Sequence, residues 1–147
     1  MARVERFDHV GVTVEDLEAV TAFFLNLGLE QEGPSQIVEG DWVDRVVGLT
    51  DVRVEVVMLR APNGGTKLEL SKFHRPVDER GPQPAPANQL GLCNVAFAVD
   101  DIQAVVDRLH ADGFDLVGEV GVYEDAYRLC YVRGPEGIIV SLAEQRA

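Results

Sequence analysis

The chain contains an internal repeat, and this repeat limits the folds it can adopt. Residues 94–118 align without a gap on residues 9–33, each 85 positions later in the chain. Residues 137–144 align in the same way on 65–72. A repeat of this length is usually one supersecondary unit. The sequence therefore predicts two copies of one module, which we place at 5–73 and 92–147. The positions shared by the two copies are mostly apolar residues, turn glycines and an Asp: Val10/Val95, Val14/Val99, Asp16/Asp101, Ala19/Ala104, Val20/Val105, Gly28/Gly113 and Gly33/Gly118.

Each copy begins with a strand and a helix. In the first copy, the valines of 10–14 alternate with His9 and small residues, which is the period of a half-buried strand with one open face. An acidic pair, Glu15 and Asp16, then suits a helix N-terminus. Apolar residues follow at helical spacing up to Gly28, where we expect the helix to end. Further strands are expected at 52–60, 66–73, 126–133 and 137–144, with hairpin turns at 62–65 and 134–137.

The segment 74–91 separates the two copies. It holds four of the seven prolines and almost no apolar residues. This composition is typical of an extended linker, and a lid over a pocket is the alternative. We expect residues 1–147 to fold as one domain, because the open sheet of each module needs the other to bury it.

The composition excludes several classes of partner. A chain of 147 residues that is 46% hydrophobic can bury a core without disulfides. Its net charge of −12 would repel nucleic acids and anionic membranes. No apolar run is long enough to span a membrane and the start lacks a secretory signal, so we expect a cytoplasmic location. Cys93 and Cys130 form no CxxC motif and lie in apolar runs, which favours two reduced core thiols.

Several spaced motifs resemble the vicinal oxygen chelate superfamily, also called the glyoxalase, bleomycin resistance protein and dioxygenase superfamily. They are FDHVGVTVEDLEAV, LNLGLE, TKLEL, VAFAVDDI and GPEGIIVSLAE. The resemblance covers nearly the whole chain. It implies an α+β fold in which two βαβββ modules join their sheets into a cup. It also implies a small organic ligand on the floor of the cup, and often a homodimer.

The resemblance also implies up to four metal-ligand positions. By position these are His9, Glu69, Asn94 and Ser141. An imidazole and a carboxylate are ordinary ligands of first-row metals, whereas an amide and a hydroxyl bind them feebly. We therefore expect at best half of a metal centre, with either no required cofactor or a weakly bound divalent ion such as Ni, Zn, Mn or Fe.

Three functions are compatible with this set. The first, which we favour, is a metal-free pocket that binds or sequesters a small apolar or aromatic molecule. The second is a metal-dependent lyase, isomerase, epimerase or dioxygenase that uses a weak His9 and Glu69 site, with a glyoxalase-type lyase or isomerase expected if the chain is an enzyme. In the third, His9 and Glu69 move a proton without a metal. Glu69 and His9 are the candidate catalytic residues in the last two.

Two further segments are candidates for the pocket. Trp42 and Arg45 lie close together, and Tyr127 and Arg128 belong to a cluster at 122–131 that also holds Tyr123 and Tyr131. An Arg can bind a substrate carboxylate while an aromatic face covers its apolar part. Alternatively, the Arg residues pair with the many acids and the aromatic residues belong to the core. His74 is expected in a solvated loop and His110 at a helix end. The expected substrate-binding residues are Asn94, Ser141, Trp42, Arg45, Tyr127 and Arg128.

Overall fold

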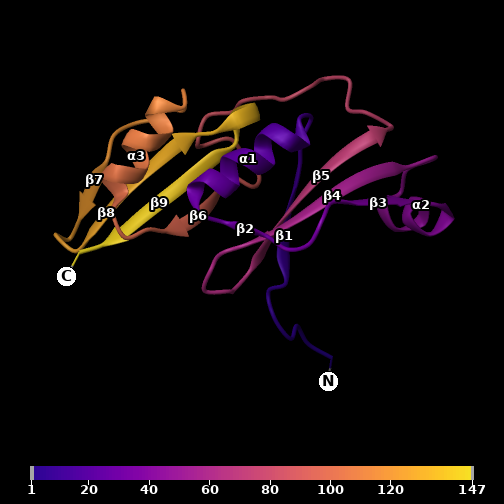
Figure 1. Ribbon diagram of the computed structural model, residues 1–147, viewed down its shortest axis with the longest axis horizontal. Coiled ribbons are helices and arrows are strands. Elements are labelled where there is room, and N and C mark those ends of the chain that lie inside the picture. Colours follow the sequence, from indigo (N-terminus) through magenta and orange to yellow (C-terminus); the bar gives the residue numbers. More distant parts are fainter. Residues whose placement is uncertain (1, 147) are drawn as a thin grey trace. The chain divides into compact units, whose positions relative to one another are not determined.

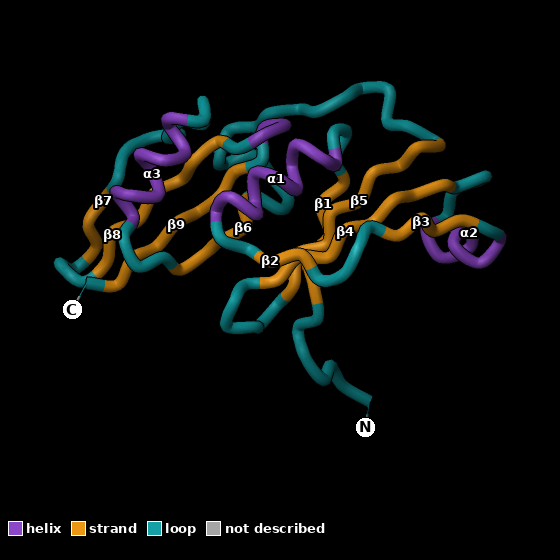
Figure 2. The backbone as a smooth tube through the Cα atoms, viewed as in Figure 1, coloured by secondary structure: helices purple, strands orange, loops and turns teal. Residues whose placement is uncertain are grey.

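The computed structural model describes residues 2–146 and divides the chain into two compact units, one up to Pro82 and the other from Gln83 (Figures 1 and 2). Each unit has its own sheet and is described by itself. Within the described residues, no helix is long and apolar enough to cross a membrane.

The first unit is a mixed sheet with two helices. The strands are ordered β1-β5-β4-β2, and β3 also pairs with β4. β1 runs parallel to β5, and the other pairs are antiparallel. The bounds are β1 (His9–Thr13), α1 (Leu17–Leu27), β2 (Glu30–Gln31), β3 (Gln36–Glu39), α2 (Asp41–Val47), β4 (Arg53–Arg60) and β5 (Lys67–Arg75).

The second unit repeats the same plan with one helix fewer. Its strands are ordered β6-β9-β8-β7, and β6 again runs parallel to the last strand. A short 3-10 turn, Pro135–Gly137, joins β8 to β9. The bounds are β6 (Asn94–Ala98), α3 (Ile102–Ala111), β7 (Gly121–Tyr123), β8 (Tyr127–Arg133) and β9 (Ile139–Gln145).

The strand registers confirm the predicted repeat. Gly11 of β1 lies opposite Glu69 of β5, and Ala96 of β6 lies opposite Ser141 of β9. These pairs are related by the same sequence offsets that align the two copies. The predicted α+β fold of two modules is therefore confirmed. The first module differs by α2, which the sequence analysis did not predict.

The two long helices begin and end as the sequence predicts. Asp16 accepts a hydrogen bond from the Ala19 amide at 3.0 Å, and Asp101 accepts one from the Ala104 amide at 3.1 Å. Such side-chain caps satisfy amides that have no partner within the helix. Gly28 follows α1 with φ at 123°, a backbone angle that favours glycine. The apolar residues that follow helical spacing in the two helices are buried: Leu17, Val20, Phe23, Phe24, Leu27, Ile102, Val105, Val106 and Leu109.

One face of the first sheet is covered by α1, which packs against β5. Residues directly opposite each other in a ladder share a face, and neighbours along a strand alternate between faces. The buried Leu68 and Leu70 therefore lie on the α1 side with their β1 partners. His9, Gly11 and Glu69 lie on the other face, which we call the open face of the first unit.

The helix α2 covers one end of this open face. Its Val43 is buried in a cluster with Val52 and Val54. Val56 of β4 and Phe73 of β5 pack against the same cluster. Because these strand residues share a face with Glu69, α2 lies on the same side of the sheet as the candidate site.

The segment after Pro82 is held against the second unit. Arg133 Nη1 donates to the carbonyl of Ala85 at 2.7 Å and to that of Gly137 at 3.1 Å. Pro84 lies so close to Gly137 that a Cβ atom there would be 2.7 Å from Pro84 Cα. Residues 84–85 are thus fixed by contacts, although the whole of 74–91 reads as a linker in the sequence.

Two smaller expectations were wrong. His74 lies in β5 and not in a loop, at a bulge where the pairing with β4 shifts register. A bulge re-aims the side chain, and His74 Nε2 lies 2.9 Å from Glu55 Oε1. Both cysteines are free, but only Cys130 is buried, which raises the pKa of its thiol. Cys93 is half-buried, and its thiol donates to the Ala87 carbonyl.

Candidate functional site

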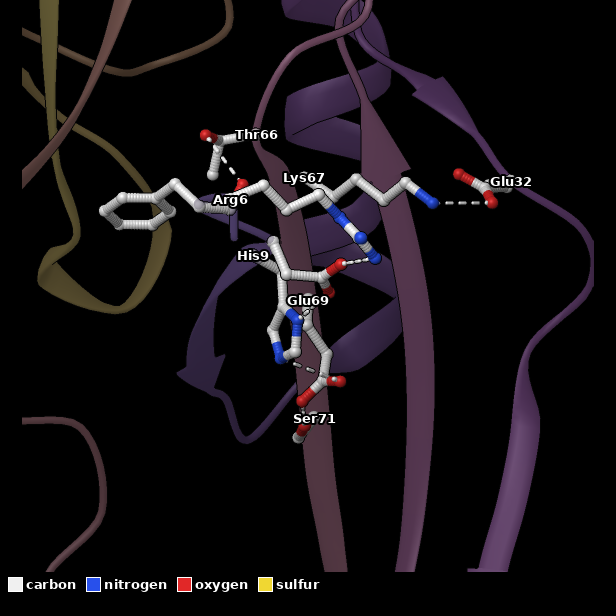
Figure 3. A network of polar contacts seen from close by, with 9 residues as sticks. Arg6, His9, Glu32, Thr66, Lys67, Glu69 and Ser71 are labelled. Carbon is white, nitrogen blue, oxygen red and sulfur yellow. Dashed lines mark hydrogen bonds and ion pairs between the residues drawn. The ribbon is translucent and has the colours of Figure 1, made fainter. Parts of the chain in front are cut away.

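His9 stands at the start of β1, where Asp8 fixes its ring. Its Nδ1 lies 2.7 Å from Asp8 Oδ2, and Arg6 donates to the other carboxylate oxygen at 2.9 Å (Figure 3). The hydrogen bonds from His9 and Arg6 lower the pKa of Asp8. Asp8 is therefore ionised and can only accept, so His9 carries its proton on Nδ1. This arrangement leaves Nε2 available on the open face.

Glu69 faces that second ring nitrogen. Its Oε2 lies 3.6 Å from His9 Nε2, and Ser71 Oγ donates to its Oε1 at 3.3 Å (Figure 3). A separation of 3.6 Å is too long for a hydrogen bond. The two side chains are 38% and 28% exposed, so a small molecule can reach both. Gly11 lies beside the carboxylate and presents no side chain there.

The nearby lysine does not neutralise Glu69. Lys67 lies on the same face, two residues earlier on β5, but its ammonium donates to Glu32 at 2.9 Å (Figure 3). Lys72 donates to the backbone carbonyl of Glu15 on the α1 side. The contacts of Glu69 are thus with the Ser71 hydroxyl and the His9 ring.

A resident transition metal fits this donor set poorly. Within residues 2–146, no group of three or more His, Cys, Asp or Glu side chains is arranged so that it could hold a metal ion. Catalytic metal sites usually take three protein ligands, and structural sites usually take four. His9 and Glu69 provide two. The first unit by itself does not form a tight metal centre.

The second unit carries neutral groups at the equivalent positions. Asn94 occupies the place of His9, and Ser141 occupies the place of Glu69. Asn94 Nδ2 donates to the Tyr131 hydroxyl at 3.2 Å. Tyr131 lies directly opposite Ser141 in the ladder between β8 and β9. The structure therefore gathers an amide, a phenol and an alcohol on one face of the second sheet.

The remaining candidate substrate-binding residues lie on α2 and β8. Trp42 and Arg45 lie on α2, where both are exposed, Trp42 to 60%. In the second unit, Tyr127 shares the face of Ser141, whereas Arg128 lies opposite Glu144 on the other face. Their roles as substrate contacts stay predictions.

Three members of these sites were not predicted from the sequence. Asp8 could have been found as an acid directly before the candidate histidine. Ser71 follows Glu69 by two residues in a strand, and that spacing places both on one face. Tyr131 was noted only as part of an aromatic cluster. The strand pairing that places it beside Asn94 and Ser141 is not visible in the residue spacing.

Comparison with known proteins now assigns the class. Residues 8–131 match the model of the Glyoxalase/Bleomycin resistance protein/Dioxygenase superfamily. The chain belongs to this superfamily, as its motifs indicated.

The chain is similar to several individual proteins of known structure or function. A glyoxalase family protein from Bacillus cereus has a crystal structure that matches with a TM-score of 0.94 and 44% identity, over 99% of this chain and 97% of that one. An ethylmalonyl-CoA/methylmalonyl-CoA epimerase from Cereibacter sphaeroides is 28% identical over 96% of this chain and 98% of its own length. A fosfomycin resistance protein from Listeria monocytogenes, solved with Mn(II) and sulfate, shares the fold at 13% identity and a TM-score of 0.59, covering 98% of this chain and 95% of that one.

Proposed function

We propose that this chain is an epimerase or isomerase that moves a proton at a carbon atom next to a carbonyl group, without a resident transition metal. The observation that carries this proposal is the series of contacts from Asp8 to His9 and from His9 to Glu69. Two groups that can accept and release a proton, Glu69 and the Nε2 side of His9, face one another 3.6 Å apart on an accessible face. Such groups are the usual agents of general acid and base catalysis.

The reaction can be written from these groups. Glu69 takes the proton from the carbon, and the electron pair of the broken C–H bond moves onto the carbonyl oxygen to give an enolate. Asp8 holds His9 in one tautomer, so the Nε2 nitrogen of His9 is a second base beside the Glu69 carboxylate. Glu69 exchanges the proton that it took with solvent and can return one to the same face of the enolate. A proton that reaches the opposite face from solvent restores the carbonyl group with the configuration inverted. Ser71 holds one oxygen of Glu69, which directs the other oxygen toward His9.

The epimerase relative supports this class of reaction. It is named for acyl thioesters of malonic acid derivatives, in which one C–H lies between two carbonyl groups. Such a proton is acidic enough for a carboxylate base within a protein site. We therefore propose an acyl thioester of this kind as the substrate.

Binding without reaction is the second candidate. A groove of about 860 Å³ lies between α1 and the sheet, on the face away from His9. Leu17, Leu25 and Val57 form apolar walls, and Glu55 with His74 forms a polar end. The mixture of apolar and polar side chains suits a small organic molecule.

The homodimer and the cytoplasmic location expected from the sequence stay predictions.

Deuterium exchange separates the two candidates. We expect the purified protein in D2O to exchange the C2 proton of methylmalonyl-CoA faster than buffer alone, because Glu69 returns a deuteron from solvent. The methyl doublet in the ¹H NMR spectrum would collapse to a singlet. If the protein binds methylmalonyl-CoA but the C2 proton exchanges no faster than in buffer alone, the chain is a binding protein and the proton-transfer function is rejected.

A further inference from the structure

One face of the second sheet gathers hydrogen-bond donors around Ser141. In the ladders, Ala96 of β6, Ser141 of β9 and Tyr131 of β8 lie side by side in one row. Asn94 lies on the same face, two residues before Ala96, and contacts the Tyr131 hydroxyl. We infer that Asn94, Tyr131 and Ser141 form a binding site for an anionic oxygen group, either a carboxylate or an enolate.

The hydrogen-bond donors of Asn94 and Tyr131 favour an oxygen ligand. The amide of Asn94 has two N–H donors, and Tyr131 has one O–H donor. Their mutual hydrogen bond uses one of these three. Asn94 is the donor, so its second N–H and the Tyr131 O–H are left for a third partner, and Ser141 adds another hydroxyl. Hydrogen bonds from such groups to an ionised oxygen are stronger than those to a neutral one.

The charges on this face favour an anion. Although the chain has a net charge of −12, β6, β8 and β9 place no Asp or Glu on this side. Glu144 lies on the other face, where it caps α3 through the Ile102 amide. The residues on the Ser141 face of these strands are Asn94, Ala96, Ala98, Tyr127, Leu129, Tyr131, Arg133, Ile139, Ser141, Ala143 and Gln145.

Among the described residues of β6, β8 and β9, Arg133 is the one cationic residue on the Ser141 face. Arg133 lies across Ile139 from Asn94, in the row next to Ser141. Its guanidinium donates to the carbonyls of Ala85 and Gly137, and in the described part of the chain it forms no ion pair with a carboxylate. Without a carboxylate partner, its charge favours an anion over a cation on this face.

The neighbouring residues leave room for the ligand. Ala96, Ala98 and Ala143 have small side chains, and Leu129 beside them is 41% exposed. A carboxylate with a short apolar body therefore fits this face. The inference goes beyond the proposed reaction, because it concerns binding by the second unit alone and needs no turnover.

Malonate binding tests this site. We expect malonate to shift the side-chain amide signals of Asn94 in ¹H–¹⁵N NMR spectra of the full chain, with an Asn94→Ala variant used to assign them. Tyr131→Phe should weaken binding about tenfold or more, because it removes one donor to an ionised oxygen. Gln145→Ala is the matched control, since Gln145 carries an amide donor on the same strand and face as Ser141 but two pairs further along. Its malonate affinity should stay that of the wild type.

Three results would overturn the inference. These are the absence of malonate binding, equal binding of the uncharged malonamide, and equal losses in the Tyr131 and Gln145 variants. Repeating the titration in a Glu69→Gln background separates this site from the proposed reaction. Malonate should still bind there, even if the chain catalyses no exchange at all.

Discussion

Replacing Glu69 by Gln is expected to slow deuterium exchange at C2 of methylmalonyl-CoA by about 10²-fold to 10⁴-fold, the usual contribution of a positioned general base. A Gln side chain has nearly the same shape, and its amide oxygen can still accept the hydrogen bond from Ser71. It cannot take a proton from carbon at neutral pH. The loss should therefore appear in the exchange rate, with the circular dichroism spectrum unchanged.

Glu55→Gln is the matched control for this variant. Glu55 lies on the neighbouring strand of the same sheet but on the α1 side, where it lines the groove. Hydrogen bonds from His74 and Ser35 lower its pKa. The control should exchange at the wild-type rate. Equal rates in the wild type and the Glu69 variant would show that Glu69 is not the base.

The second large effect concerns stability. Phe24→Ala should lower the free energy of unfolding of the first unit by about 3–5 kcal/mol, the range found for buried Phe. The Phe24 side chain has 0% exposure and packs edge to face on Phe23, with ring centroids 5.1 Å apart. Its removal leaves a cavity beneath α1. Urea unfolding followed by the fluorescence of Trp42, the single tryptophan and a member of the same unit, measures the change.

Leu25→Ala provides the comparison in the same helix. Leu25 is 39% exposed, so its truncation should cost less than about 1 kcal/mol, as is usual for surface positions. Similar losses in the two variants would mean that α1 is not anchored through Phe24.

The modules could be predicted because their signals are local. Helical spacing after Asp16 and Asp101 identifies α1 and α3, and both aspartates cap their helices. Alternation in β1 and β6 correctly predicts one open face in each sheet. The helix α2 was missed because it is short. Its anchor in the core is Val43, whose partners come from β3, β4 and β5.

The candidate site could be predicted only in part. His9 and Glu69 were identified because the resemblance to the superfamily places them at ligand positions, and the structure brings them together. The orientation of His9 depends on Asp8, and the contact between Asn94 and Tyr131 depends on pairing across β6, β9 and β8. Such contacts join residues far apart in the chain, so spacing alone does not predict them.

We propose that His9 and Glu69 transfer a proton without a bound transition metal. The most direct measurement is the exchange rate of methylmalonyl-CoA in protein that has been treated with a chelator and analysed for metal content. We predict that the treated protein exchanges the C2 proton at the rate of the untreated protein. The treated protein should then hold less than about one metal ion per ten chains, an order-of-magnitude threshold for an empty site. Loss of exchange on metal removal, with recovery on adding one equivalent of a divalent ion, would contradict the account.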